Sequence, residues 1–170
     1  GTLVSNGALW SVINMKGQFS EGHEFQVHLE PAGPERRRLT IHSGDAGAAL
    51  RGLGLYGNMT GGMLDISGEY DDSKLGSPLA GNIAVNDFRI VRAPVLVQLL
   101  SIMALTGVLD VLEGEGLVFD DLEAPFVLHN GVMSIEQGRA SGRSIGFTSS
   151  GTIDTRGDNL DLVGTVVPAY

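Results

Sequence analysis

Residues 24–43, EFQVHLEPAGPERRRLTIHS, contain the pattern that decides the fold. Apolar residues alternate with polar ones on both sides of a proline-containing turn: Phe25, Val27 and Leu29 before it, Leu39 and Ile41 after it. Successive side chains of a β-strand point to opposite faces of a sheet, so this period of two indicates two half-buried strands. The turn between them predicts an antiparallel hairpin.

The same pattern recurs along most of the chain. Further strands are expected at residues 8–16, 63–70, 79–91, 117–119, 126–128, 132–137, 144–150, 151–155 and 159–167. Asn130-Gly131 is a strong signal for a two-residue hairpin turn. Strands and helices do not alternate, which argues against a parallel doubly wound sheet. The sequence therefore predicts a mainly β protein, an antiparallel meander with one apolar face.

Two segments depart from the strand pattern. Asp45 can cap a short helix over about residues 45–53, which ends in glycines. Residues 93–109 carry no charge, and with Pro94 in the first turn they predict a long apolar helix over about 94–112. Three interpretations of this helix stay open: a core helix covering the sheet, a helix lying along an apolar groove, or a membrane span, for which it is short.

We expect a single β-rich segment of a longer protein. Residues 1–91 would hold strands and the short helix, 92–115 the apolar helix, and 116–170 a C-terminal β-meander. The net charge of −9 argues against nucleic acid as a partner, and also against docking on anionic lipid headgroups. The chain has no cysteine, which excludes disulfides and cysteine-based metal sites.

Catalytic motifs have simpler explanations. Gly52 to Gly57 matches G-x-G-x-x-G, but no strand precedes it and no helix can start after it. The four histidines have no metal-binding spacing, and the adjacent acids Asp71-Asp72 and Asp120-Asp121 suit turns. We therefore expect no enzyme, no metal site and no cofactor, although a hydrolase built from residues distant in sequence is a remaining alternative.

Residues 116–170 resemble the C-terminal region of the AsmA-like superfamily, which includes YhdP-like and TamB-like bacterial envelope proteins. Four elements carry the resemblance, in the family's order: G-L-x-F-D-D at Gly116–Asp121, a strand and N-G turn at Leu128–Val132, G-x-x-D at Gly151–Asp154, and V-V-P-A-Y at Val166–Tyr170. Upstream, the helix from Asp45 and the strand after Gly61-Gly62 also match, so the resemblance covers about residues 40–170 well and the first 40 loosely.

This resemblance implies a curved, groove-forming sheet in a protein of the bacterial periplasm and cell envelope. Such proteins are anchored in the inner membrane, here by a segment outside this chain, and are thought to move phospholipid toward the outer membrane. The implied partners are phospholipid acyl chains and other envelope proteins. The main alternative is a structural or assembly module of the envelope, whose sheet forms a closed core and binds protein partners.

The predicted groove lining is the set of apolar residues expected on one face, together with three from the long helix. It comprises Ile13, Met15, Phe25, Val27, Leu29, Leu39, Ile41, Leu64, Ile66, Ile83, Val85, Leu99, Leu100, Met103, Phe119, Phe126, Leu128, Ile135, Ile145, Phe147, Ile153, Leu160 and Leu162. An ordinary packed core would use the same residues, and alternation alone does not distinguish the two.

Overall fold

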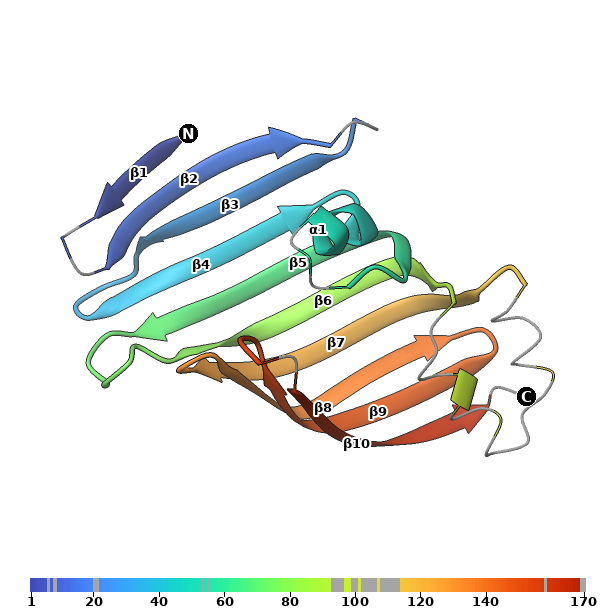
Figure 1. The fold of residues 1–170 in the computed structure, drawn as a ribbon. Helices are drawn as coiled ribbons and strands as arrows, with labels where there is room; N and C mark the ends of the chain where they lie inside the picture. Colours follow the sequence, from blue (N-terminus) through green and yellow to red (C-terminus); the bar gives the residue numbers. More distant parts are fainter. Residues whose placement is uncertain are drawn as a thin grey trace.

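A single antiparallel sheet dominates the computed structural model (Figure 1). The structure describes residues 1–5, 7, 9–19, 22–52, 54, 56–92, 97–98, 101, 107, 114–157 and 159–168. Ten strands follow one another across the sheet in sequence order, and each pairs with its neighbours in the chain. The sheet is therefore a meander, and its two outermost strands do not pair with each other.

The strands lengthen toward the middle of the sheet. They are β1 (Thr2–Ser5), β2 (Trp10–Gln18), β3 (Glu24–Pro31), β4 (Arg36–Ser43), β5 (Met59–Asp71), β6 (Leu79–Ile90), β7 (Leu117–His129), β8 (Val132–Gly142), β9 (Ile145–Asp154) and β10 (Asn159–Pro168). The turn between β7 and β8 confirms the predicted two-residue hairpin: φ is 51° at Asn130 and 79° at Gly131. A turn of type I′ needs positive φ at both positions.

Three strand predictions were wrong. The strand β1 was not predicted. Residues 117–119 and 126–128 belong to one strand, β7, although Pro125 lies between them. Pairing with β8 is irregular between Glu123 and Phe126, so the missing N–H of Pro125 falls where the ladder is already interrupted.

Residues 144–150 and 151–155, expected as two strands, form the single strand β9. Gly151 was interpreted as a break, but it lies inside the strand with φ 141°. A Cβ at Gly151 would lie 2.0 Å from the carbonyl oxygen of Asp161. Glycine is therefore required here because the backbone of β10 approaches closely, and not because the strand ends.

The short helix is confirmed as α1 (Ala46–Gly52). Its N-cap is Asp45, whose Oδ1 accepts a hydrogen bond of 2.8 Å from the backbone N–H of Ala48. The long apolar helix expected over 94–112 falls almost entirely outside the described residues. The structure describes no long helix, and α1 is too short to cross a membrane.

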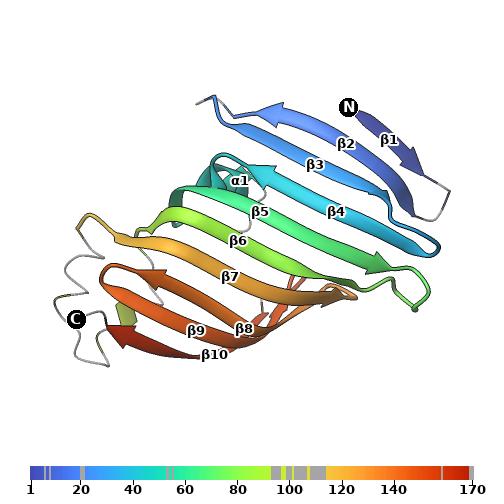
Figure 2. The same ribbon diagram turned by 180° about the vertical axis from the view of Figure 1, so that it is seen from behind.

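A line of unpaired residues crosses the sheet near α1. Pairing between β5 and β6 omits Gly62 and Asp87, and pairing between β6 and β7 omits Asp87 and Asp120. Gly62 and Asp87 have positive φ, 88° and 53°. A register shift occurs on this line only in the pairing of β7 with β8, where Asp120 is an extra residue, and such a bulge increases the local twist. The sheet is curved, as both views show (Figures 1 and 2).

Candidate functional site

One face of the sheet, called the inner face here, is apolar across nearly all strands. The pairing register places Val27 beside Ile41, Ile41 beside Ile66, and Ile66 beside Ile83. Such rows of paired residues share a face because directly paired side chains project to the same side. The inner face also carries α1, which packs on β5, and it faces the viewer in Figure 1.

The register places every predicted lining residue that belongs to a strand on the inner face. These are Ile13, Met15, Phe25, Val27, Leu29, Leu39, Ile41, Leu64, Ile66, Ile83, Val85, Phe119, Phe126, Leu128, Ile135, Ile145, Phe147, Ile153, Leu160 and Leu162. The other three, Leu99, Leu100 and Met103, lie outside the described residues. The pairing register establishes that these residues share a face; whether they contact lipid is a different question, addressed under the proposed function.

Sequence reasoning missed several inner-face residues. They include Tyr70, Leu79, Phe88, Ile90, Leu117, Leu122, Met133 and Val166. Phe88 lies three residues after the inward Val85, and Leu122 three after Phe119; the residues Asp87 and Asp120, which lie between them, are unpaired in the β6–β7 ladder. Strict alternation would place Phe88 and Leu122 on the opposite face, and no signal in the sequence marks the change.

Exposure differs sharply along the inner face. In the middle strands Leu64, Val85 and Phe119 are 3%, 2% and 0% exposed. Toward the first and last strands Met15 is 41% exposed and Leu160 is 57% exposed. The middle of the face is therefore a packed core, and its two sides are accessible apolar surface.

Helix α1 covers part of the middle. Ala46 and Ala49 pack in one cluster with Leu64, Val85 and Phe88, and Val97 also contacts this cluster. Gly47 permits the close approach, since a Cβ there would lie 2.4 Å from the carbonyl oxygen of Met59. In the same region Arg51 donates a 2.8 Å hydrogen bond to that oxygen, which anchors the end of the helix.

Three phenylalanines fill the space beside α1. Phe119 stacks on Phe88 with ring centroids 5.1 Å apart and meets the edge of Phe147 at 5.3 Å. They come from the neighbouring strands β6 and β7 and from β9. Aromatic pairs at these separations add to the energy of burial, so this cluster stabilises the packing of β6, β7 and β9.

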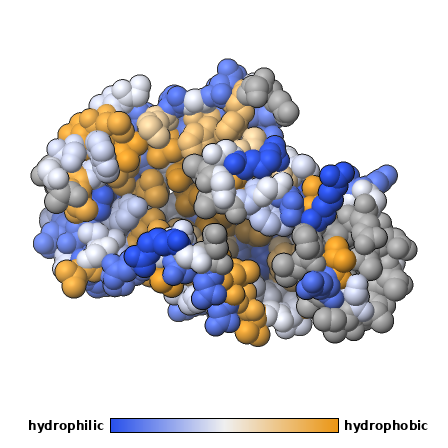
Figure 3. Space-filling view, in the orientation of Figure 1, coloured by the Kyte–Doolittle hydropathy of each residue, from blue (hydrophilic) through white to orange (hydrophobic). Residues whose placement is uncertain are grey.

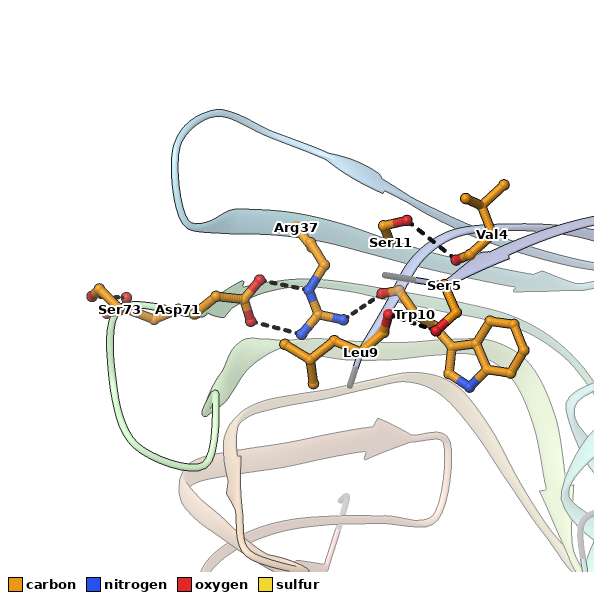
Figure 4. Close-up of polar contacts among 9 residues, drawn as sticks. Val4, Ser5, Leu9, Trp10, Ser11, Arg37, Asp71 and Ser73 are labelled. Carbon is orange, nitrogen blue, oxygen red and sulfur yellow. Dashed lines mark hydrogen bonds and ion pairs between the residues drawn. The ribbon is translucent and has the colours of Figure 1, made fainter. Parts of the chain in front are cut away.

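A buried arginine lies on the inner face at the opposite ends of the strands, next to the turns (Figure 4). The Nε and Nη2 atoms of Arg37 donate hydrogen bonds of 2.6 and 2.7 Å to the carboxylate of Asp72. Nη1 donates one of 2.8 Å to the carbonyl oxygen of Trp10, and the guanidinium lies 4.4 Å from the centroid of the Tyr70 ring. These contacts tie β2, β4 and β5 together.

At this end of the sheet, acidic and basic side chains pair with each other, and the pairing shifts their pKa values. The hydrogen bonds from Arg37 lower the pKa of Asp72, and those to Asp72 raise the pKa of Arg37. Burial raises the pKa of Tyr70. Hydrogen bonds from Ser73 and Lys74 lower the pKa of Asp71 to about 2. Because its charge is paired with the carboxylate of Asp72 and it also bonds the carbonyl oxygen of Trp10, Arg37 connects structural elements and is not an open site for a phosphate group.

The outer face is polar and carries pairs of opposite charge. Examples are Arg36–Glu69 at 2.9 Å and Arg139–Glu123 at 2.7 Å, each between neighbouring strands. Nδ1 of His42 also lies 2.8 Å from Oδ1 of Asp65 there. A shallow depression of about 610 Å³ lies there between β8 and β10, near Thr148 and Thr165. It is open and lacks a cluster of buried polar groups, so it does not have the properties of a catalytic pocket.

Hydrophobic residues gather in a hollow on the side that carries the inner face, with more hydrophilic residues around it (Figure 3). Within the described parts of the chain, no group of three or more His, Asp and Glu side chains is arranged to hold a metal ion. Among those same residues, α1, Phe19 and Val97 pack on the central cluster of the inner face in addition to residues of the sheet.

Comparison with known proteins identifies no family for this chain. No family model, no curated protein and no solved structure matches it.

Proposed function

We propose that this chain is a non-catalytic lipid-handling segment of an AsmA-like envelope protein. The observation that carries the proposal is the continuous apolar inner face, which runs from β2 to β10 on a curved sheet whose outermost strands do not pair with each other. The occupants would be the acyl chains of phospholipids. The segment would conduct phospholipid between the inner and outer membranes, in a periplasmic protein anchored through other parts of the polypeptide.

Acyl chains suit this surface energetically. Each CH₂ group removed from water contributes roughly 0.8 kcal/mol, so contact along a few strands holds a chain without directional bonds. Among the described residues, the strands contribute to the inner face one cationic side chain, Arg37, and it is bound to Asp72, while Arg51 of α1 donates to the carbonyl oxygen of Met59. Headgroups would therefore stay in water while the tails follow the inner face.

The exposure of each residue narrows the proposed contact surface. A fully buried side chain such as Phe119 cannot touch lipid unless the aromatic cluster opens. The proposed contacts are thus the half-buried and exposed members of the inner face, such as Met15, Ile66, Phe147 and Leu160. Lipid would pass beside the cluster under α1 and not through it.

Site-specific photo-crosslinking in cells, in the full-length protein, tests this function. A photoreactive amino acid replaces Ile66, Ile83 or Phe147 on the inner face. Matched controls are the next residues, Ser67 and Thr148, which are exposed on the outer face. We expect lipid adducts at the three inner sites only. Equal labelling of both faces, or no lipid at any site, contradicts the proposal.

A structural or assembly module of the envelope is the second candidate. The packed cluster beneath α1 favours it, because that part of the sheet is an ordinary core. In this case photo-crosslinking would yield protein adducts at the outer positions and no lipid at the inner ones. The same set of variants therefore discriminates between the two functions.

A further inference from the structure

The ladder between β2 and β3 stops before it reaches the turn end of the sheet. Its last pair is Ile13–Leu29. Beyond that pair, residues 10 and 12 of β2 pair with β1, and Glu30 and Pro31 of β3 pair with β4, but none of them pairs across the boundary between β2 and β3. The sheet therefore contains an internal interruption, called the β2–β3 seam here, with strands of this chain on both sides of it.

A proline accounts for the seam. In an antiparallel sheet the backbone groups of successive residues point alternately to the two neighbouring strands. The N–H of Ala32 donates a 2.9 Å hydrogen bond to the carbonyl oxygen of Arg36, on the β4 side, so the nitrogen of Pro31 is directed toward β2. Continuing the β2–β3 register by two residues places Pro31 opposite Ser11. Because proline has no N–H, the next pair of ladder hydrogen bonds cannot form.

A side chain bridges the seam in place of the backbone. Arg37 lies opposite Pro31 in the β3–β4 ladder, and its Nη1 donates a 2.8 Å hydrogen bond to the carbonyl oxygen of Trp10, on the far side of the seam (Figure 4). Arg37 is 8% exposed, so it fills the space next to the interrupted ladder. The connection across the seam at this point thus rests on a side chain that can rotate.

We propose that the sheet opens at the β2–β3 seam, with Arg37 as the latch. When Arg37 releases the carbonyl oxygen of Trp10, the turn end of β1 and β2 moves away from the turn end of β3, with the pair Ile13–Leu29 as the pivot. Arg37, Ile13 and Leu29 all lie on the inner face, so the movement creates a lateral entrance to that face.

The charges allow this opening without an unpaired ion. Nε and Nη2 of Arg37 donate to the carboxylate of Asp72, which lies on the same side of the seam as Arg37. These two hydrogen bonds stay intact when the bond to Trp10 breaks, and water can then bond the released carbonyl oxygen. Local opening of this kind costs less free energy than unfolding of the sheet. The latch does not depend on lipid transport, because it rests on the ladder and not on what the inner face binds.

Distances between pairs of spin labels test the opening in the full-length protein. This chain has no cysteine, so Val4→Cys with Leu75→Cys places one label on each side of the seam, at positions that are 45% and 96% exposed. Glu35→Cys with Leu75→Cys is the matched control. Both of its labels lie on the β4–β5 side, where the N–H of Asp72 donates to the carbonyl oxygen of Glu35 at 2.8 Å.

Two changes at Arg37 release the latch. Arg37→Met removes all of its hydrogen bonds, whereas Arg37→Lys keeps a positive charge beside Asp72 but lacks the planar fork that reaches both Asp72 and Trp10. We expect longer distances for Val4–Leu75 in both variants, with the ratio of open to closed molecules raised roughly tenfold or more, as for the loss of one hydrogen bond from a charged group. The distance for Glu35–Leu75 should not change.

Controls at the neighbouring residues make the test specific. Arg36→Met removes an exposed arginine that pairs with Glu69 and should leave both distances unchanged. Pro31→Ala supplies the missing N–H opposite Ser11, so in the Arg37→Lys background it should extend the ladder and return Val4–Leu75 to the short distance. Longer distances in both label pairs, unchanged distances in both Arg37 variants, or a shift that Pro31→Ala does not reverse would each overturn the proposal.

Discussion

Phe119 in β7 and Leu162 in β10 both lie on the inner face, yet Phe119 is 0% exposed and Leu162 is 38% exposed. Both belong to strands with the same antiparallel pairing. The difference comes from the neighbouring residues. Phe119 contacts two aromatic rings in the central cluster on which α1 packs, whereas Leu162 is on the last strand of the sheet. One apolar face can thus be a packed core at its centre and an accessible apolar surface at its sides.

The largest expected effect tests the central core. Phe119→Ala removes the ring that contacts Phe88 and Phe147, and we expect it to lower the free energy of unfolding by about 3–5 kcal/mol. Leu162→Ala is the matched change on the same face and should cost less than about 1 kcal/mol. Urea unfolding measures both. Equal losses would mean that the inner face is one uniform core.

The second prediction concerns the buried tie at the turn end of the sheet. Asp72→Asn removes the charge that pairs with Arg37 and should lower the free energy of unfolding by about 2–4 kcal/mol at pH 7. Glu69→Gln is the control, because Glu69 and Arg36 are 38% and 49% exposed and such pairs contribute about 0–1 kcal/mol. If both changes lowered the free energy of unfolding by a similar amount, the burial of Arg37 would add nothing to the strength of its pair with Asp72.

The same tie predicts a pH dependence. Because the folded-state pKa of Asp72 is lowered, its contribution to stability is complete above the unfolded value of about 3.9 and is lost as the pH falls through the folded value. The stability difference between the unmodified chain and Asp72→Asn should therefore shrink in urea titrations below about pH 4. A difference that grows with acidity contradicts this.

The third prediction compares two glycines of α1. Gly47→Ala pushes a methyl group into the backbone at Met59, so we expect a loss of about 1–3 kcal/mol as α1 shifts from the sheet. Gly52→Ala meets only the Phe19 ring at 4.0 Å and should be neutral or stabilise by up to about 1 kcal/mol. Hydrogen exchange at Leu64 and Val85 in both variants reports whether α1 protects the core.

The smallest effect is expected at the accessible side of the inner face. Met15→Gln puts a polar group on a residue that is 41% exposed and should change the free energy of unfolding by no more than about 0.5 kcal/mol. Val85→Asn, at a site 2% exposed, would leave a buried amide unsatisfied and is the contrasting control. A large loss in Met15→Gln would extend the packed core to β2.

Alternation predicted most strands and the shared face, because side chains of a strand alternate whatever the surroundings. Alternation failed where the placement of a residue depends on contacts with other parts of the sheet. Gly151 lies inside β9 and admits the backbone of β10, and Phe88 belongs to the same buried cluster as Val85 although it lies three residues after it, with the positive-φ residue Asp87 between them. Alternation places Val85 and Phe88 on opposite faces, so the inward position of Phe88 could not be derived from spacing.

The sequence by itself determined that this chain forms an antiparallel meander with one apolar and one polar face, with Asp45 starting a short helix. It also determined the charge and the lack of cysteine that narrow the possible partners. Only the tertiary structure decided which apolar residues are buried and which are accessible, because that depends on where α1 packs and on which strands lie in the middle of the sheet. These are properties of contacts between distant segments, and a pattern within one strand does not contain them.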